Sequence, residues 1–186
     1  MKENVRVLAL SSGPIQHKKR VPLIGVVARA GGLVEGVLAS FVDVNGSDGT
    51  QRIIKMLRTS QFHEQVRIIA LNGIAIAGLN VLDLEELRRR LGVEVISLTK
   101  RKPHKRELLR AIKSFSERAH EDTYARENFI NSLKVNEFAT HDLYFQTTLP
   151  QKYAVKIAVE TWELIRLSHL IARGIGSGLK SDPKTL

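Results

Sequence analysis

The sequence predicts a single α/β domain in which a mixed β-sheet carries helices on both faces. Three observations lead to this fold class. Three short apolar strands open the chain, a strand–helix–strand unit follows, and helical periodicity fills most of the remainder. At 186 residues the chain has the length of one domain. We therefore predict one domain over residues 1–186, with five or six strands and no internal repeat or linker.

The first three strands are predicted at residues 5–10, 23–27 and 34–42. The first ends at Ser11-Ser12-Gly13-Pro14, a sequence that breaks strand structure. The second and third are joined across Ala30-Gly31-Gly32, whose glycine pair suits a tight hairpin. These strands should form an antiparallel meander.

A helix is predicted over residues 49–60, where Ile53, Ile54 and Leu57 fall on one face. Asp48 precedes Gln51 by three residues, as in a capping box, so Asp48 is first interpreted as the N-cap of this helix. A role for its carboxylate as a ligand stays open beside that interpretation.

A βαβ unit is predicted next, with strands at residues 66–71 and 93–98 around a helix at 84–91. Asp83 is expected to cap that helix and Gly92 to end it. The two strands should be parallel with a right-handed crossover. The rest is predicted as helix over 104–133, a strand at 144–148, helices at 151–165 and 165–173, and a glycine-rich C-cap and flexible tail at 174–178. This order is that of ribonuclease H-like domains.

Composition and charge narrow the class of function. Lys and Arg total 29 against 19 Asp and Glu, which gives a net charge of +10 and favours a polyanionic partner, nucleic acid first. The chain contains no cysteine, so disulfides and cysteine–zinc sites are excluded. The uncharged stretch Ile68–Leu82 is too short and too polar to span a bilayer. No signal-peptide pattern opens the chain, so we expect a cytoplasmic protein with no membrane partner; no oligomeric state is predicted.

Four stretches resemble a known protein family. The most specific is the block from Ala70-Leu71-Asn72-Gly73 to Asp83, continuing to Lys100-Arg101-Lys102-Pro103. Residues 10–14, 34–50 and 166–172 support it in order and spacing. Together they resemble domain-of-unknown-function family 99 (UPF0215-type), an uncharacterised, mainly archaeal family similar to endonuclease V. The resemblance implies a ribonuclease H-like fold and a groove for nucleic acid.

The resemblance also implies where a metal site would lie. Endonuclease V uses carboxylates and magnesium, which prefers hard oxygen ligands, to hydrolyse a phosphodiester. Here Ser11 or Ser12 stands at the first-strand position and Asn72 at the fourth-strand position, where the family has acids. Asp48 is the one acid in the expected order. We therefore expect a vestigial cleft formed by Ser11, Ser12, Asp48 and Asn72, with no resident metal and Asp48 as the weak candidate ligand. Asn72 is equally open to a purely conformational role before Gly73.

Two basic runs are predicted near the same edge of the sheet. The expected nucleic-acid-binding residues are Lys18, Lys19, Arg20, Lys100, Arg101, Lys102, Lys105 and Arg106. Few aromatic residues interleave with them, so contact with the phosphate backbone is favoured over base stacking. A solvated charged loop is the alternative interpretation. The six histidines show no metal-ligand spacing, and His169 is interpreted as an ordinary helix residue.

The leading hypothesis is an endonuclease V-related protein that binds DNA or RNA and has lost or weakened metal-dependent cleavage. Two rivals remain. The first is an active Mg²⁺- or Mn²⁺-dependent endonuclease in which Asp48 acts with Glu35 or Asp43, which lie eight residues apart in the third strand region. The second is a non-catalytic domain that binds a protein partner through the old cleft.

Overall fold

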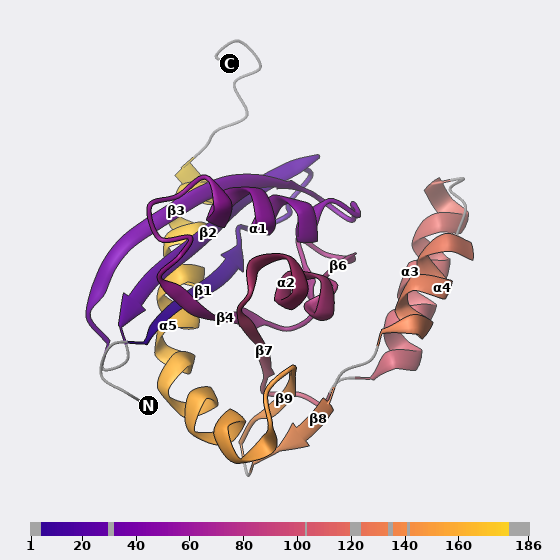
Figure 1. Cartoon of the computed structure of the whole chain (residues 1–186). Coiled ribbons are helices and arrows are strands. Elements are labelled where there is room, and N and C mark those ends of the chain that lie inside the picture. The colour runs from indigo at the N-terminus through magenta and orange to yellow at the C-terminus, as the bar shows by residue number, and fades with distance from the viewer. Residues whose placement is uncertain are drawn as a thin grey trace.

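The computed structural model describes residues 5–29, 32–102, 104–119, 124–133, 136–140 and 142–178. Its main feature is a seven-stranded sheet, with the strands in the order β3-β2-β1-β4-β7-β9-β8 (Figure 1). The strands are β1 (Arg6–Ser12), β2 (Arg20–Arg29), β3 (Val34–Asp43), β4 (Val66–Asn72), β7 (Glu94–Thr99), β8 (Asn136–Ala139) and β9 (Tyr144–Thr147).

The pairing of the strands confirms the predicted fold class. β1, β2 and β3 form an antiparallel meander, whereas β1 pairs with β4, and β4 with β7, in parallel. This is the ribonuclease H-like arrangement. Residues 30 and 31 of the predicted hairpin lie outside the described residues, and the pairing of Ala28 with Val34 shows that β2 and β3 are antiparallel neighbours.

The sheet has more strands than the five or six predicted. β9 matches the strand expected at 144–148, but β8 was not predicted, because its four residues carry little alternation of their own. Pairing with β9, and packing of Phe138 against Phe145, hold β8 in the sheet.

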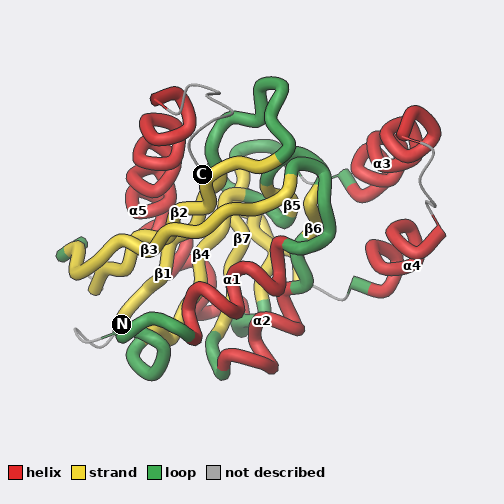
Figure 2. The backbone as a smooth tube through the Cα atoms, turned by 90° about the horizontal axis from the view of Figure 1, so that it is seen from above, coloured by secondary structure: helices red, strands yellow, loops and turns green. Residues whose placement is uncertain are grey.

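Helices α1 (Gly49–Arg58) and α2 (Leu84–Leu91) cover one face of the sheet, and α5 (Gln151–Gly178) covers the other (Figure 2). Two apolar clusters result, since successive strand residues point to opposite faces. Leu10 and Leu71 pack with α1 and α2, whereas Ala9 and Ala70 pack with α5. Both faces of the sheet are therefore buried under helices.

The region predicted as helical over 104–133 forms two helices, α3 (Lys105–Ala119) and α4 (Tyr124–Ser132). They do not cover the sheet. They pack on the small hairpin of β5 (Ala75–Ile76) and β6 (Asn80–Val81), through a cluster centred on Val81, Ile112 and Ile130. In Figure 2 the pair projects beyond β5 and β6 as an arm.

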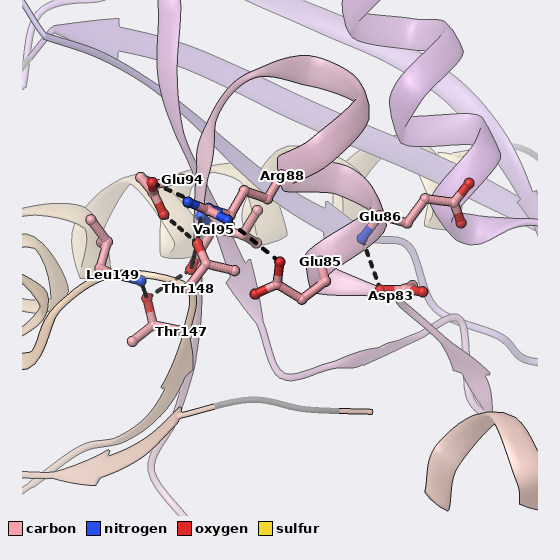
Figure 3. Close-up of polar contacts among 9 residues, drawn as sticks. All are labelled: Asp83, Glu85, Glu86, Arg88, Glu94, Val95, Thr147, Thr148 and Leu149. Atoms are coloured by element: carbon pink, nitrogen blue, oxygen red, sulfur yellow. Dashed lines mark hydrogen bonds and ion pairs between the residues drawn. The ribbon is translucent and has the colours of Figure 1, made fainter. Parts of the chain in front are cut away.

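The ends of the helices were predicted with mixed success. Asp83 caps α2 as expected, with its Oδ1 accepting from the Glu86 amide at 2.9 Å, and Gly92 ends the helix in the left-handed region at φ 66° (Figure 3). The predicted tail at 174–178 is wrong, because α5 continues to Gly178. Gly176 is buried there, and a Cβ at this position would lie 2.6 Å from Pro14 Cδ.

Among the helices that the structure describes, none is long and apolar enough to cross a membrane.

Candidate functional site

The candidate site lies where β1, β4 and β7 end. Because these strands are parallel, Ser12, Asn72 and Thr99 all reach the same edge of the sheet. The loop that leads into α1 and the β5–β6 hairpin lie at this edge too. In open α/β sheets this carboxyl edge is the usual place for a ligand.

Ser11 points away from the predicted cleft. It is 3% exposed, and its Oγ accepts a hydrogen bond from Ser168 Oγ at 2.9 Å and donates to the Ile165 carbonyl at 3.4 Å. Both partners belong to α5. Ser11 therefore anchors α5 to the end of β1, in a space where an unpaired carboxylate would be buried beside a carbonyl oxygen.

Ser12 points to the opposite face, as strand alternation requires. Its Oγ accepts from the Ala77 amide at 2.9 Å, and the Ala77 carbonyl accepts from the Asn45 amide at 2.9 Å. Ser12 thus fastens the β5–β6 hairpin over the end of β1, next to the loop that carries Asp48.

The carboxylate of Asp48 is occupied by internal partners. Oδ1 accepts from Asn80 Nδ2 at 2.8 Å and from the Asp43 amide at 3.2 Å, while Oδ2 accepts from Arg52 Nε at 2.7 Å. Asp48 stands at the predicted N-cap position of α1, but its side chain makes no cap hydrogen bond. Asn80 Oδ1 accepts from the Gly49 amide in its place, at 3.0 Å.

These contacts set the protonation of Asp48. Burial acts to raise the pKa of its carboxyl group, but hydrogen bonds from Arg52, Asn80 and the Asp43 amide, with the charge of Arg52, outweigh it. The pKa of Asp48 therefore lies below its ordinary value of 3.8. Asp48 is an ionised group whose counter-ion is a guanidinium of its own helix.

Asn72 is exposed at the end of β4, immediately before Gly73 at φ 79°. The register places it on the same face as Ser11, because Leu10 pairs with Leu71. The four residues of the predicted cleft therefore do not converge: Ser12 and Asp48 lie on one side of the sheet, and Ser11 and Asn72 on the other.

This donor set does not fit a magnesium ion. Three of the carboxylate's lone-pair sites on Asp48 already accept hydrogen bonds, and the other three positions are neutral. Within the part of the chain that the structure describes, no group of three or more His, Cys, Asp and Glu side chains is arranged to hold a metal ion.

Glu35 and Asp43, the two acids of the active-enzyme alternative, are both held in ion pairs. Glu35 lies near the first residue of β3 and forms ion pairs with Arg6 and Arg29, at the opposite end of the sheet from Asp48. Asp43 ends β3 and pairs with Arg20 at 3.0 Å. The geometry contradicts a site that combines Glu35 with Asp48.

The first basic run is partly held by the fold. Lys18 Nζ donates to the Gly176 carbonyl near the end of α5, and Arg20 is paired with Asp43 and lies over the Phe41 ring. Lys19 is exposed, and its side chain has no hydrogen bond or ion pair among the described residues. The run does leave the same edge of the sheet as Ser12.

The second basic run is more exposed to solvent than the first. Lys100, Arg101 and Lys102 are all exposed in the loop after β7, and Lys100 Nζ lies 5.6 Å from the centre of the Trp162 ring. Lys105 donates to the Asn131 carbonyl at 3.3 Å, and Arg106 is exposed on α3. We call the eight predicted cations the basic rim.

A pocket of about 380 Å³ opens between the rim and the end of β4. Apolar side chains of α3 and α4 form one wall, and Thr99, His104 and Lys105 bring polar groups from the loop after β7. Glu137 and Gln146, hydrogen-bonded to each other at 2.6 Å, close its far side. The carboxyl edge therefore combines a recess with exposed cations.

Asn80 was not singled out in the sequence, although it organises the site. It is fully buried at 0% exposure and binds Gly49, Asp43 and Asp48. In a glycine-rich segment an asparagine is typical of a turn, so nothing local distinguishes it. Only the three-dimensional packing shows that it replaces Asp48 as the cap of α1.

Comparison with known proteins gives a consistent family. A family model described as endonuclease dU matches residues 3–176. A UPF0215 protein from Methanothermobacter thermautotrophicus is 33% identical, over 96% of this chain and 91% of that protein. Another from Methanopyrus kandleri is 31% identical, over 98% of this chain and 96% of that protein.

Two solved structures are also similar. A protein of unknown function from Archaeoglobus fulgidus superposes with a TM-score of 0.80 at 28% identity, covering 94% of this chain and 99% of that one. Endonuclease V from Ciona intestinalis, solved with a 24mer DNA containing an inosine followed by a ribo-adenosine, gives a TM-score of 0.61 at 11% identity, covering 95% and 87%. The second likeness concerns the fold alone.

Proposed function

Because the chain belongs to the endonuclease dU family, we propose that it binds nucleic acid through the carboxyl edge of its sheet and has weak or no metal-dependent cleavage. One observation carries this proposal. At that edge the metal positions are neutral or internally paired, whereas the loop after β7 keeps exposed cations and Lys105 lines a pocket. Such an edge attracts a phosphate backbone without the carboxylates that would hold a catalytic ion.

Binding is tested by fluorescence anisotropy with labelled single- and double-stranded DNA and RNA of equal length, over a series of KCl concentrations. The logarithm of the affinity should fall linearly with the logarithm of salt concentration, because each neutralised phosphate releases counterions. A flat salt response, or no binding to any of the four probes, would contradict the proposal.

A matched pair of variants locates the surface. Changing Lys100, Arg101 and Lys102 to Gln should lower the salt slope by about 2 to 3 for duplex DNA, since each phosphate contact contributes about 0.9. The control changes Lys55, Arg67 and Arg89 to Gln, three exposed cations away from this edge, with the same loss of net charge. Equal losses in both variants would assign the binding to net charge and remove the site.

Cleavage is tested on DNA and RNA that contain deoxyuridine or inosine, with Mg²⁺ or Mn²⁺. We expect no products above a metal-free control. Products that disappear in Asp48→Ala would instead establish the rival, an active metal-dependent endonuclease.

A further inference from the structure

The arm formed by α3 and α4 carries a basic stripe that continues from the rim. Arg106, Arg110 and Lys113 are exposed and spaced i, i+4 and i+7, so they share one flank of α3. They span roughly 10 Å along the helix axis, at about 1.5 Å per residue. We call these three residues the α3 stripe.

In the described part of the chain no acid is paired with the stripe, although Glu117 lies on the same flank of α3, four residues after Lys113. Among the described residues, none of its three side chains forms an ion pair or hydrogen bond with another side chain, although cations elsewhere on the molecule are paired with carboxylates. Glu107 is exposed on a different flank of the helix. The positive field is therefore concentrated at the end of the helix nearer the rim.

The opposite flank of α3 is fixed to the body. Ile112 is buried with Ile130 of α4 and Val81 of β6. Arg126 of α4 donates to the Gly46 carbonyl at 2.8 Å and to the Asn45 carbonyl, in the loop that leads to Asp48. The arm is thus docked beside the candidate site, with its basic flank turned away from this packing, and it projects outward (Figures 1 and 2).

We propose that the α3 stripe is a second contact surface for the same nucleic acid, binding phosphates beyond those held at the rim. The proposal rests on the proposed function, because it requires that a nucleic acid occupies the carboxyl edge. No aromatic side chain belongs to the stripe, so its contacts are electrostatic and independent of base sequence. A strand bound at the rim continues along α3 for two or three further phosphates.

The test uses the full chain with a double change in α3, Arg110→Gln with Lys113→Gln, since both residues lie outside the rim. Glutamine keeps helix propensity at these exposed positions, so the fold is retained, as circular dichroism and the melting temperature will show. The control, Lys55→Gln with Arg89→Gln, removes the same charge from exposed positions away from the arm. The probes are a 10-nucleotide and a 30-nucleotide DNA.

For the long probe, taken as single-stranded DNA, the stripe variant should lower the salt slope by about 1.4 and the control by far less, since each phosphate contact on a single strand contributes about 0.7. The short probe, which fills the rim alone, should bind the stripe variant and the wild type alike. A swap of charged residues, Arg110→Lys with Lys113→Arg, should restore long-probe binding.

The inference is overturned if the stripe variant binds the long probe with the wild-type slope while the loop variant at 100–102 loses affinity; the proposed function then stands. If the wild type binds neither probe, the proposed function fails and the inference fails with it.

Discussion

The two edges of the sheet use their charges in opposite ways. At the end where β1, β4 and β7 begin, arginines are bound to carboxylates: Arg6 and Arg29 hold Glu35, and Arg88 lies between Glu85 and Glu94. Glu94 also accepts from Thr148 Oγ at 2.6 Å, next to the Thr147 contact that fastens β9 to β7 (Figure 3). At the carboxyl edge the one central acid, Asp48, faces inward and the exposed cations are left over.

This difference shows how the net charge of +10 is distributed between the two edges of the sheet. Ion pairs at the amino edge cancel locally and serve the fold. At the carboxyl edge Asp48 is paired inward with Arg52, and Asp43 is paired with Arg20. Among the described residues, the exposed cations of the loop at 100–102 have no carboxylate partner.

The strongest way to break this comparison is to return an acid to the carboxyl edge. Ser11→Asp should lower the free energy of unfolding by about 3 kcal/mol or more, because a carboxylate would be buried without a cation beside the Ile165 carbonyl. Ser12→Asp should cost below about 1 kcal/mol, because that side chain is half-buried and its partner is an amide donor. Urea unfolding of both variants measures the difference, and equal costs would show that Ser11 is not enclosed by α5.

Truncation of one carboxylate at each edge sharpens the contrast. Asp48→Ala should cost about 2 kcal/mol, since Asn80 Nδ2, Arg52 and the Asp43 amide each lose an acceptor. Glu85→Ala removes an ion pair in which both side chains are about half exposed, at 49% and 51%, and should cost less than about 0.5 kcal/mol. A similar loss in the two variants, measured by denaturant unfolding, would show that Asp48 is only another surface acid.

Two glycines of α5 test how closely this helix covers the end of β1. Gly176→Ala should destabilise the protein by about 1 to 2 kcal/mol, because the new Cβ would lie 2.6 Å from Pro14 Cδ. Gly174→Ala should stabilise it by about 0.5 to 1 kcal/mol, since no atom lies within 4 Å and alanine favours the helix. The two melting temperatures should move in opposite directions. A gain in both would mean that α5 does not press on Pro14.

The sequence predicted the body of the fold well because that part is governed by local periodicity. Short apolar runs define β1, β2, β4 and β7, and the cap and stop signals of Asp83 and Gly92 define α2 within the βαβ unit. The end of α5 was missed because glycines such as Gly174 and Gly176 usually end helices, and the close approach of Pro14, which leaves no room for a Cβ at position 176, is a tertiary contact.

The sequence predicted which residues reach the carboxyl edge, but not how their side chains are directed. Order along the chain brought Ser12, Asn72 and Asp48 to one edge, as the strand ends dictate. Side chains alternate between the two faces of the sheet along a strand. An error of one residue in the predicted strand end or register therefore places a side chain on the wrong face. The hydrogen bond between Asp48 and Asn80 could not be predicted either, because Asn80 is 32 residues away in sequence.

The smallest expected effect is a change in stability at acidic pH. Hydrogen bonds hold the pKa of Asp48 below its ordinary value of 3.8, so the folded state keeps the ionised form more strongly than the unfolded state does. The stabilisation from this group is present above the unfolded-state pKa and is lost as the pH falls through the lower folded-state pKa. The stability gap between wild type and Asp48→Asn should therefore be constant from pH 7 to 5 and narrow below the ordinary pKa. Chemical denaturation at each pH measures the gap, with Glu85→Gln as the control whose gap stays small throughout. A stability gap that is unchanged down to pH 2 would mean that pairing with Arg52 does not stabilise the ionised form of Asp48. The contrast drawn between the two edges would then be contradicted.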